Sequence, residues 1–335
     1  MSRFTIMTRI LLVLGVLIVA WSIVLPFLGS TGDGQEKQRD QFAAGQVGPG
    51  DPVPFDGKRA MGYLKAICDI GPRMSATPGM KKQQELIKKH FEGLGYKVTE
   101  QKFEAKQKSQ KNAVPMTNLI VSFSPAKHRR IIICSHYDTR PIADQEEDVR
   151  KWREPFVSAN DGGSGCAFLM EMAHHMKGLP MKVGVDFVFF DGEEYIFDNR
   201  RGADDYFFGS THFAQRWKKD KDRPDYVGAV LLDMIAGKGA VFPVEGNSWQ
   251  RAEGFCKYIW GIAQQQKCTA FPQEVADYTV SDDHIPLLDV GIPALDIIDF
   301  TYKHWHKLSD TPENCAPETM EQVSKVLSVW MQRAK

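Results

Sequence analysis

The acidic pair Glu193-Glu194 is the feature of this sequence with the clearest chemical potential. It closes the segment 189–194, in which an apolar run ends at two adjacent carboxylates. At the end of a strand the backbone can turn and direct both carboxylates into one cleft, where one binds a metal and the other transfers protons. Such a pair is usually a solvated strand end, so its interpretation depends on the other polar residues of the chain.

Further polar residues lie beside an apolar run or at a Gly-rich turn: His136, Asp138, Asp161, Asp233 and His306. Ligand sites in open α/β sheets form at the carboxyl ends of the strands, so we expect these residues to converge with the acidic pair. Aspartate, glutamate and histidine ligands without a thiolate suit a catalytic zinc that keeps an open position. Taken alone, His136 is a strand-end histidine bonded to Asp138, and Asp161 is a helix N-cap. Their combination predicts a metal site.

Alternating strand and helix patterns position these residues. Apolar and alternating runs predict strands at 96–103, 118–123, 130–134, 183–190, 226–232 and 294–298. Helical spacing predicts helices at 60–70, from 78 to about 93–95, 164–176, 210–218, 249–266 and 317–333. Strands that alternate with helices indicate an α/β fold, here a three-layer sandwich with a mostly parallel central sheet.

Composition and charge exclude several classes of protein. The 335 residues contain 42 Lys+Arg and 42 Asp+Glu, so no net charge favours nucleic acid or acidic lipid. The sequence has no P-loop, no GxGxxG motif after a strand and no basic patch interleaved with aromatic residues, and we therefore expect no nucleic-acid partner. The six cysteines show no CxxC spacing, which argues against a thiolate zinc site. Cys256 and Cys268 could pair in an exported domain.

The amino-terminal segment differs from the rest of the chain. Residues 10–28 are free of charge and long enough to cross a bilayer, and Arg3 and Arg9 precede them. We therefore predict a cytoplasmic tail at 1–9, a transmembrane signal-anchor at 10–28 and a flexible linker at 29–55. Residues 56–335 would form a zinc-dependent catalytic domain on the exoplasmic side, periplasmic or extracellular. A cleaved signal peptide, which would give a secreted protein, remains an alternative.

The series His136-x-Asp138, Asp161-Gly-Gly, Glu193-Glu194, Asp233 and His306 resembles the M28-type zinc aminopeptidase superfamily. Segments 134–141, 209–212, 231–234 and 282–286, together with Trp305-His306, are similar to the glutaminyl-peptide cyclotransferases of that superfamily. The resemblance covers about residue 55 to the end of the chain. It implies the α/β fold of the M28 aminopeptidases and glutaminyl cyclases.

The resemblance also implies roles for individual residues. Asp161, Glu194 and His306 would hold one zinc. Glu193 would transfer protons, with Asp233 and Asp282 linked to it through hydrogen bonds, and Trp305 would form a wall of the substrate pocket. In the two-metal aminopeptidases the positions of His136 and Asp233, with Asp161 bridging, hold a second zinc, and Asp138 would support His136. One zinc is therefore expected here, and a second is the alternative.

Three functions remain open on this basis. The first is conversion of the N-terminal glutamine of peptides or proteins to pyroglutamate with release of ammonia. The second is an M28 zinc aminopeptidase that removes N-terminal residues. The third is an anchored ectodomain that has lost catalysis and binds a partner. Such a protein would be expected to lose ligands, whereas this chain keeps the six strand-end residues His136, Asp161, Glu193, Glu194, Asp233 and His306. The sequence departs from the animal cyclases at Asn199, where they have a tryptophan, and at Asp296, where they have a histidine.

Overall fold

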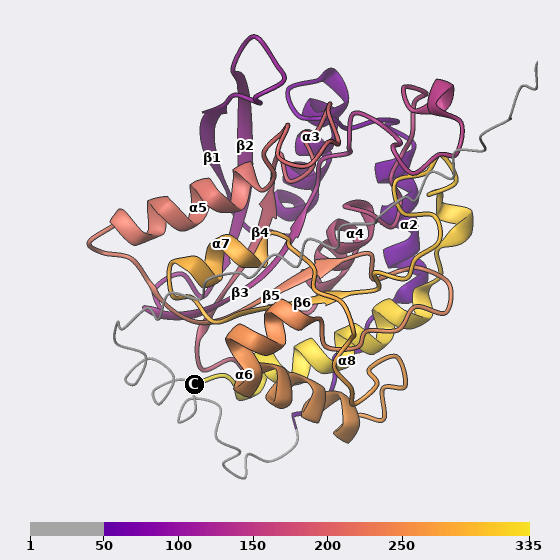
Figure 1. Cartoon of the computed structure of the whole chain (residues 1–335). Coiled ribbons are helices and arrows are strands. Elements are labelled where there is room, and N and C mark those ends of the chain that lie inside the picture. Colours follow the sequence, from indigo (N-terminus) through magenta and orange to yellow (C-terminus); the bar gives the residue numbers. More distant parts are fainter. Residues whose placement is uncertain (1–49) are drawn as a thin grey trace, which may run out of the picture.

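The computed structural model describes residues 50–335 and contains one six-stranded sheet (Figure 1). The strands are arranged in the order β1-β2-β4-β3-β5-β6. Their bounds are Val98–Ala105 (β1), Val114–Phe123 (β2), Arg129–His136 (β3), Gly184–Phe190 (β4), Asp225–Asp233 (β5) and Ala294–Ile298 (β6). The pairs β1/β2 and β2/β4 are antiparallel, and β4, β3, β5 and β6 pair in parallel. Only β2 therefore runs against the other strands, which confirms the mostly parallel sheet.

Within residues 50–335, seven α-helices cover the two faces of the sheet (Figure 1). Their bounds are Gly57–Cys68 (α2), Pro78–Gly93 (α3), Gly163–Met172 (α4), Phe208–Lys219 (α5), Gly246–Gln265 (α6), His284–Asp289 (α7) and Pro317–Arg333 (α8). The larger core joins α2, α3, α4, α6 and α8 to one face, and a second core joins α5 and α7 to the other. The predicted three-layer α/β sandwich is thus confirmed.

Strand β3 shows why both faces must be covered. Ile131 and Ile133 contribute to the larger core, whereas Ile132 and Cys134 contribute to the second. Successive side chains of a strand point to opposite faces, so a continuous apolar run buries both of them. All seven residues of β4 are buried in the same way. These two central strands fix the position of the polar residues that follow them.

The predicted helices and strands agree with the structure, with differences at several ends. The helix predicted at 164–176 ends at Met172 and is followed by turns through Gly178. Helix α7 was not predicted, because its six residues are too few to show helical periodicity. Helix α3 begins as its sequence indicates: Pro78 occupies the first turn, and the Thr77 hydroxyl accepts a hydrogen bond from the Met80 N–H at 3.3 Å.

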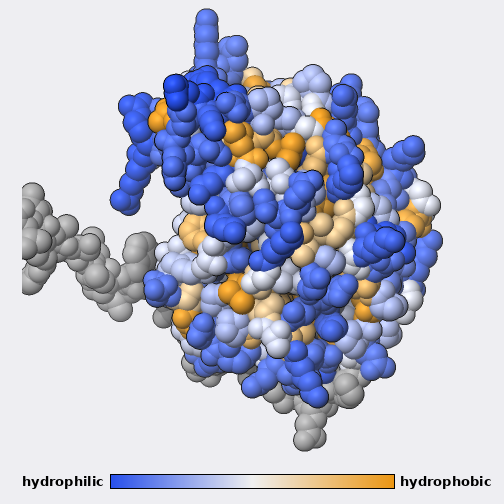
Figure 2. Space-filling model, turned by 90° about the vertical axis from the view of Figure 1, so that its right-hand side faces the viewer, coloured by the Kyte–Doolittle hydropathy of each residue, from blue (hydrophilic) through white to orange (hydrophobic). Residues whose placement is uncertain are grey.

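The predicted tail (1–9), the predicted anchor (10–28) and all of the linker up to residue 49 lie outside the described residues. Among the helices of residues 50–335, none is long and apolar enough to cross a membrane. Figure 2 shows one face of the molecule, which is mostly hydrophilic with small separate hydrophobic patches. All six cysteines are buried free thiols, so the pairing considered for Cys256 and Cys268 is wrong in this structure.

Candidate metal centre and active site

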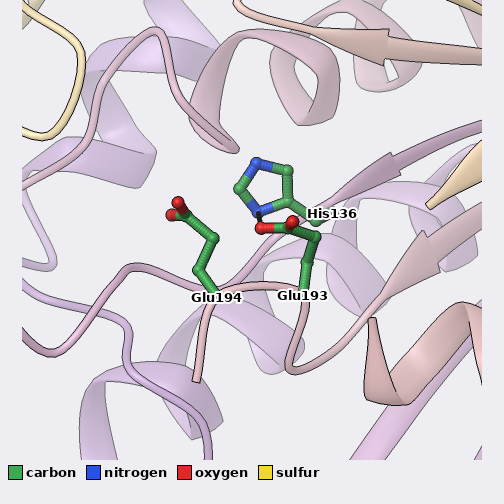
Figure 3. A group of neighbouring side chains, drawn as sticks. All are labelled: His136, Glu193 and Glu194. Atoms are coloured by element: carbon green, nitrogen blue, oxygen red, sulfur yellow. Dashed lines mark ion pairs between the residues drawn. The ribbon is translucent and has the colours of Figure 1, made fainter. Parts of the chain in front are cut away.

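The carboxyl ends of the central parallel strands bring the candidate residues together. His136 is the last residue of β3 and Asp233 the last of β5, while Glu193 and Glu194 follow β4. The other two candidates, Asp161 and His306, come from the segment before α4 and the loop after β6. All six side chains are buried. In Figure 3 the Glu193 and Glu194 side chains rise from one turn beside the His136 ring.

Asp161, Glu194 and His306 form one group whose ligand atoms lie within 4.8 Å of one another. His306 Nε2 lies 2.5 Å from Glu194 Oε1 and 3.6 Å from Asp161 Oδ2. Asp161 Oδ2 and Glu194 Oε2 are buried and accept no hydrogen bond from the protein. Buried anionic oxygens without a donor are costly unless a cation satisfies them. The oxygen and nitrogen donor set, free of thiolates, therefore fits zinc.

His136, Asp161 and Asp233 form a second group of the same kind. His136 Nε2 lies 3.1 Å from Asp161 Oδ1 and 3.4 Å from Asp233 Oδ1. The two oxygens of Asp161 thus face different histidines, so this carboxylate is common to both groups. The structure brings together the residues expected for one zinc and those named for a second.

Asp138 lies behind this centre, beside the turn that carries the acidic pair. Its Oδ1 accepts a hydrogen bond from the Glu193 N–H and its Oδ2 from the Glu194 N–H, each at 3.1 Å. His136 Nδ1 lies 3.6 Å from Asp138 Oδ1. Asp138 therefore supports His136 and both glutamates and belongs to neither of the two metal groups that contain Asp161.

The glycine after Asp161 is required by the geometry of the site. Gly162 has φ +70°, and a Cβ there would lie 2.8 Å from His136 Cε1. Helix α4 takes Gly162 as its N-cap without a side-chain hydrogen bond, so the simpler interpretation of Asp161 as an N-cap is wrong. The Asp161 carboxylate is instead directed at the two histidines.

Burial and neighbouring carboxylates shift the pKa values of the group. Burial lowers the pKa of His136, but the carboxylates of Asp138, Asp161 and Asp233 around its ring outweigh this effect and raise the pKa well above its usual value. Burial likewise lowers the pKa of His306. The negative charge of Glu194 outweighs this effect and raises the pKa of His306 to about 9. Both histidines are therefore held in an anionic environment that favours a cation.

Of the two glutamates, Glu193 has the more strongly raised pKa and therefore the stronger tendency to hold a proton. Burial, followed by the charges of Glu194 and Asp282, raises the pKa of Glu193 well above its usual range. Burial and the charge of Asp233 also raise the pKa of Asp282 well above its usual range. Burial and the charge of Asp282 also raise the pKa of Asp296 well above its usual value. These carboxyl groups can therefore carry protons next to the metal centre.

A cavity of about 440 Å³ opens onto this centre. Its acidic wall contains Glu193, Glu194, Asp233 and Asp282, and its apolar wall contains Val280, Ile298, Phe300 and Trp305. The Trp305 ring lies 4.9 Å from the Phe300 ring and 4.0 Å from the His306 ring, centroid to centroid. Trp305, which was predicted to form a pocket wall, thus lines this cavity, and Asn199 lines it as well.

Two residues that contact the candidate ligands, Arg140 and Asp144, were missed by sequence reasoning. Asp144 Oδ2 accepts a hydrogen bond from Arg140 at 2.9 Å, and Arg140 Nη1 lies 3.6 Å from Glu194 Oε1. Arg140 also donates to the Tyr206 hydroxyl at 3.2 Å. The only available signal was the position of Arg140 within the segment 134–141, because Asp144 lies in a loop without periodicity.

Comparisons with known proteins agree with this geometry. The model of peptidase family M28 matches residues 118–331, well over half of the chain. A solved structure of Fimbriiglobus ruber glutaminyl cyclase is 51% identical, covers 87% of this chain and 100% of its own, and has a TM-score of 0.83. A leucine aminopeptidase precursor from Bacteroides thetaiotaomicron is 28% identical over 85% of this chain and 100% of its own, with a TM-score of 0.76.

Curated relatives point in the same direction. Glutaminyl-peptide cyclotransferase of Boiga dendrophila is 27% identical over 290 residues, which cover 77% of this chain and 76% of the relative. The match of the family model over most of the catalytic body, together with the two ligand groups at the strand ends, leads to one conclusion: the chain belongs to peptidase family M28.

Proposed function

We propose that this protein is a zinc-dependent glutaminyl-peptide cyclotransferase, which converts the N-terminal glutamine of peptides or proteins to pyroglutamate and releases ammonia. The observation that carries the proposal is the 51% identity to the Fimbriiglobus ruber glutaminyl cyclase along that protein's whole length. The cavity supports it, because Glu194 and His306 of the metal group, the proton-carrying Glu193 and the aromatic ring of Trp305 line the same cavity.

Asp161, Glu194 and His306 would hold the catalytic zinc. When bound there, zinc acts as a Lewis acid that polarises the γ-carboxamide carbonyl of the substrate glutamine. Arg140 and Asp144 hold Glu194 and His306 in place from the outer side of the site. The second group, with His136 and Asp233, gives this chain a second candidate metal position.

Glu193 is the residue placed to move the proton. Its carboxylate accepts a proton from the substrate α-amine as the nitrogen attacks the γ-carboxamide carbon. It then returns that proton to the leaving nitrogen, so a C–N bond forms, a C–N bond breaks and ammonia departs. The raised pKa of Glu193, caused by burial and the neighbouring carboxylates Glu194 and Asp282, suits a group that must hold a proton between these steps.

The remaining cavity residues position the substrate and exclude water. Trp305 presents an aromatic face on which the planar carboxamide of glutamine can lie. Asp282 and Asp233 line the same cavity as Glu193; the charge of Asp282 raises the pKa of Glu193, and the charge of Asp233 raises that of Asp282. Exclusion of water favours cyclisation, because the substrate amine is then the only nucleophile near the carbonyl carbon.

An activity comparison tests the proposal. Purified protein with zinc is offered a Gln-initiated peptide and, separately, leucine p-nitroanilide. We expect ammonia and pyroglutamyl peptide from the first and no p-nitroaniline from the second. Glu193→Gln, which keeps the shape of the side chain and removes its proton-carrying function, serves as the matched inactive control. Release of p-nitroaniline without cyclisation would overturn the assignment.

An aminopeptidase is the second candidate, and one feature favours it. His136, Asp161 and Asp233 form a second buried ligand group beside the first, and a two-metal centre suits hydrolysis by an activated water. A structural neighbour described as a leucine aminopeptidase precursor shares the fold at 28% identity. The 51%-identical cyclase gives the cyclotransferase stronger support.

We further propose that residues 10–28 anchor the protein and that the catalytic domain acts on the exoplasmic side. The uncharged run of 19 residues behind Arg3 and Arg9 supports this orientation. Alkaline carbonate washing of membranes should leave the full-length chain in the pellet, and external protease should reach the catalytic domain once an outer barrier is permeabilised. Recovery of the chain in the wash, with its amino terminus intact, would contradict the anchor.

A further inference from the structure

Asp310 holds the turn that carries Asp161. It lies four residues after His306 and is fully buried. Its Oδ1 accepts a hydrogen bond from the Asn160 N–H at 2.9 Å, and its Oδ2 accepts one from the Asp161 N–H at 3.1 Å. The backbone carbonyl of Asp310 accepts a third from the Ala159 N–H at 3.2 Å. One residue of the His306 loop therefore fixes the Asp161 turn at three points.

The other side of the turn is tied to the segment after β5. Asn160 Oδ1 accepts a hydrogen bond from the Ala236 N–H at 2.8 Å. The Ser164 hydroxyl donates to the Asn160 carbonyl at 2.5 Å and accepts from the Ile235 N–H at 3.1 Å. Ile235 and Ala236 follow Asp233 by two and three residues. The turn that carries Asp161, the ligand common to both groups, is therefore also fixed by Ile235 and Ala236, which lie close in sequence to Asp233.

We propose that Asp310 is a positioning residue of the zinc site, which sets the separation of Asp161 from His306. Hydrogen bonds from backbone N–H groups to a carboxylate are roughly twice as strong as those between neutral groups. The same arrangement occurs at Asp138, which accepts from the N–H groups of Glu193 and Glu194. The Tyr302 hydroxyl donates to Asp310 Oδ1 at 2.9 Å and orients the carboxylate.

This inference rests on the zinc site of the proposed function and not on the reaction that the site catalyses. Zinc affinity is therefore the direct readout. The dissociation constant is measured on the full-length chain by competition with a chromophoric zinc chelator, for the wild type, Asp310→Ala, Asp310→Asn and Tyr302→Phe. Loss of a group that orients a metal ligand typically costs about 10- to 100-fold in affinity. We expect that loss in Asp310→Ala.

The conservative variants should fall between the wild type and Asp310→Ala. The amide of Asp310→Asn keeps one oxygen to accept an N–H, but its NH2 group cannot accept the second. Tyr302→Phe removes only the hydroxyl that orients the carboxylate, so its loss should be the smallest of the three. If Asp310→Ala does not fold, these two variants carry the test.

Asp186→Asn is the matched control for a merely structural role. Asp186 is also a buried aspartate, but its oxygens bond Arg130 at 2.8 and 2.6 Å near the amino ends of the strands. Asp186→Asn should lower the temperature of unfolding and leave the zinc dissociation constant unchanged. The inference is overturned if the Asp310 variants keep wild-type zinc affinity. It is also overturned if zinc affinity simply follows thermal stability in both sets of variants.

Discussion

Asp144 Oδ1 lies 2.9 Å from His306 Nδ1. A carboxylate at this position holds the proton on Nδ1 and turns the lone pair of Nε2 toward Asp161 and Glu194. Arg140 in turn bonds the other oxygen of Asp144. Histidine orientation at this site therefore depends on a residue that lies in a loop far from His306 in the sequence.

Asp144→Ala should consequently weaken zinc binding by about 10- to 100-fold, because the imidazole loses the partner that fixes its tautomer and orientation. Chelator competition measures the effect. Asp148→Ala serves as the control. Asp148 lies in the same loop, and its carboxylate accepts hydrogen bonds from the backbone N–H and the side chain of Arg150. Its substitution should leave zinc affinity unchanged. Equal zinc affinity in the Asp144 variant and the wild type would show that His306 is held by other contacts.

Glu193 and Glu194 are chemically alike, yet their positions predict different results on substitution. Glu193→Gln should keep zinc and reduce kcat by about 10²- to 10⁴-fold with little change in substrate affinity, because it removes a proton-transfer group. Glu194→Gln should lose zinc first, with activity partly restored by excess metal. Zinc content and kinetics of both variants distinguish the roles. If Glu193→Gln loses zinc and Glu194→Gln keeps it, the two roles are reversed.

Gly162→Ala should disrupt the site, because the new methyl group would contact the His136 ring and the backbone has φ +70°. We expect loss of both zinc and thermal stability. Gly261→Ala is a matched control, since this glycine lies inside α6 and a Cβ there meets no atom within 4 Å. That substitution should raise the stability by up to about 1 kcal/mol, the difference in helix propensity. A Gly162→Ala protein with normal zinc content would show that the His136 ring tolerates a methyl group at position 162.

The pair of Glu245 and His284 predicts a specific dependence of stability on pH. Although burial opposes it, the nearby His284, whose Nε2 lies 3.2 Å from Glu245 Oε1, lowers the pKa of Glu245 to about 2 together with hydrogen bonds from Ser248 and Val280. A carboxyl group with a depressed pKa stabilises the fold above its unfolded value of about 4.3, and this contribution is lost as the pH falls toward 2.

Urea unfolding of the zinc-free wild type and Glu245→Gln at several pH values measures this contribution. The difference in the free energy of unfolding should be largest at neutral pH and should shrink as the pH falls below about 4.3. A difference that stays constant between pH 7 and pH 3 would show that the ionised form of Glu245 is not favoured by the fold.

Much of the candidate site was predictable from the order of residue types. His136 and Asp233 end apolar runs, and Glu193 and Glu194 follow one, so a parallel sheet must place them at one edge. Asp161 was predictable from the two glycines that follow it. These residues depend on local pattern and strand direction, both of which the sequence encodes directly.

The partners that hold the ligands were decided by tertiary structure alone. Asp310 bonds Asn160 and Asp161 across a separation of about 150 residues, and Asp144 reaches His306 from a loop with no periodicity. Helix α7 was missed for a related reason, since six residues give too little pattern. An aspartate in a loop has the same sequence signature whether it caps a turn, faces solvent or supports a ligand. Its role is determined by which backbone N–H groups or side chains the folded chain brings within hydrogen-bond distance, because those contacts depend on long-range packing.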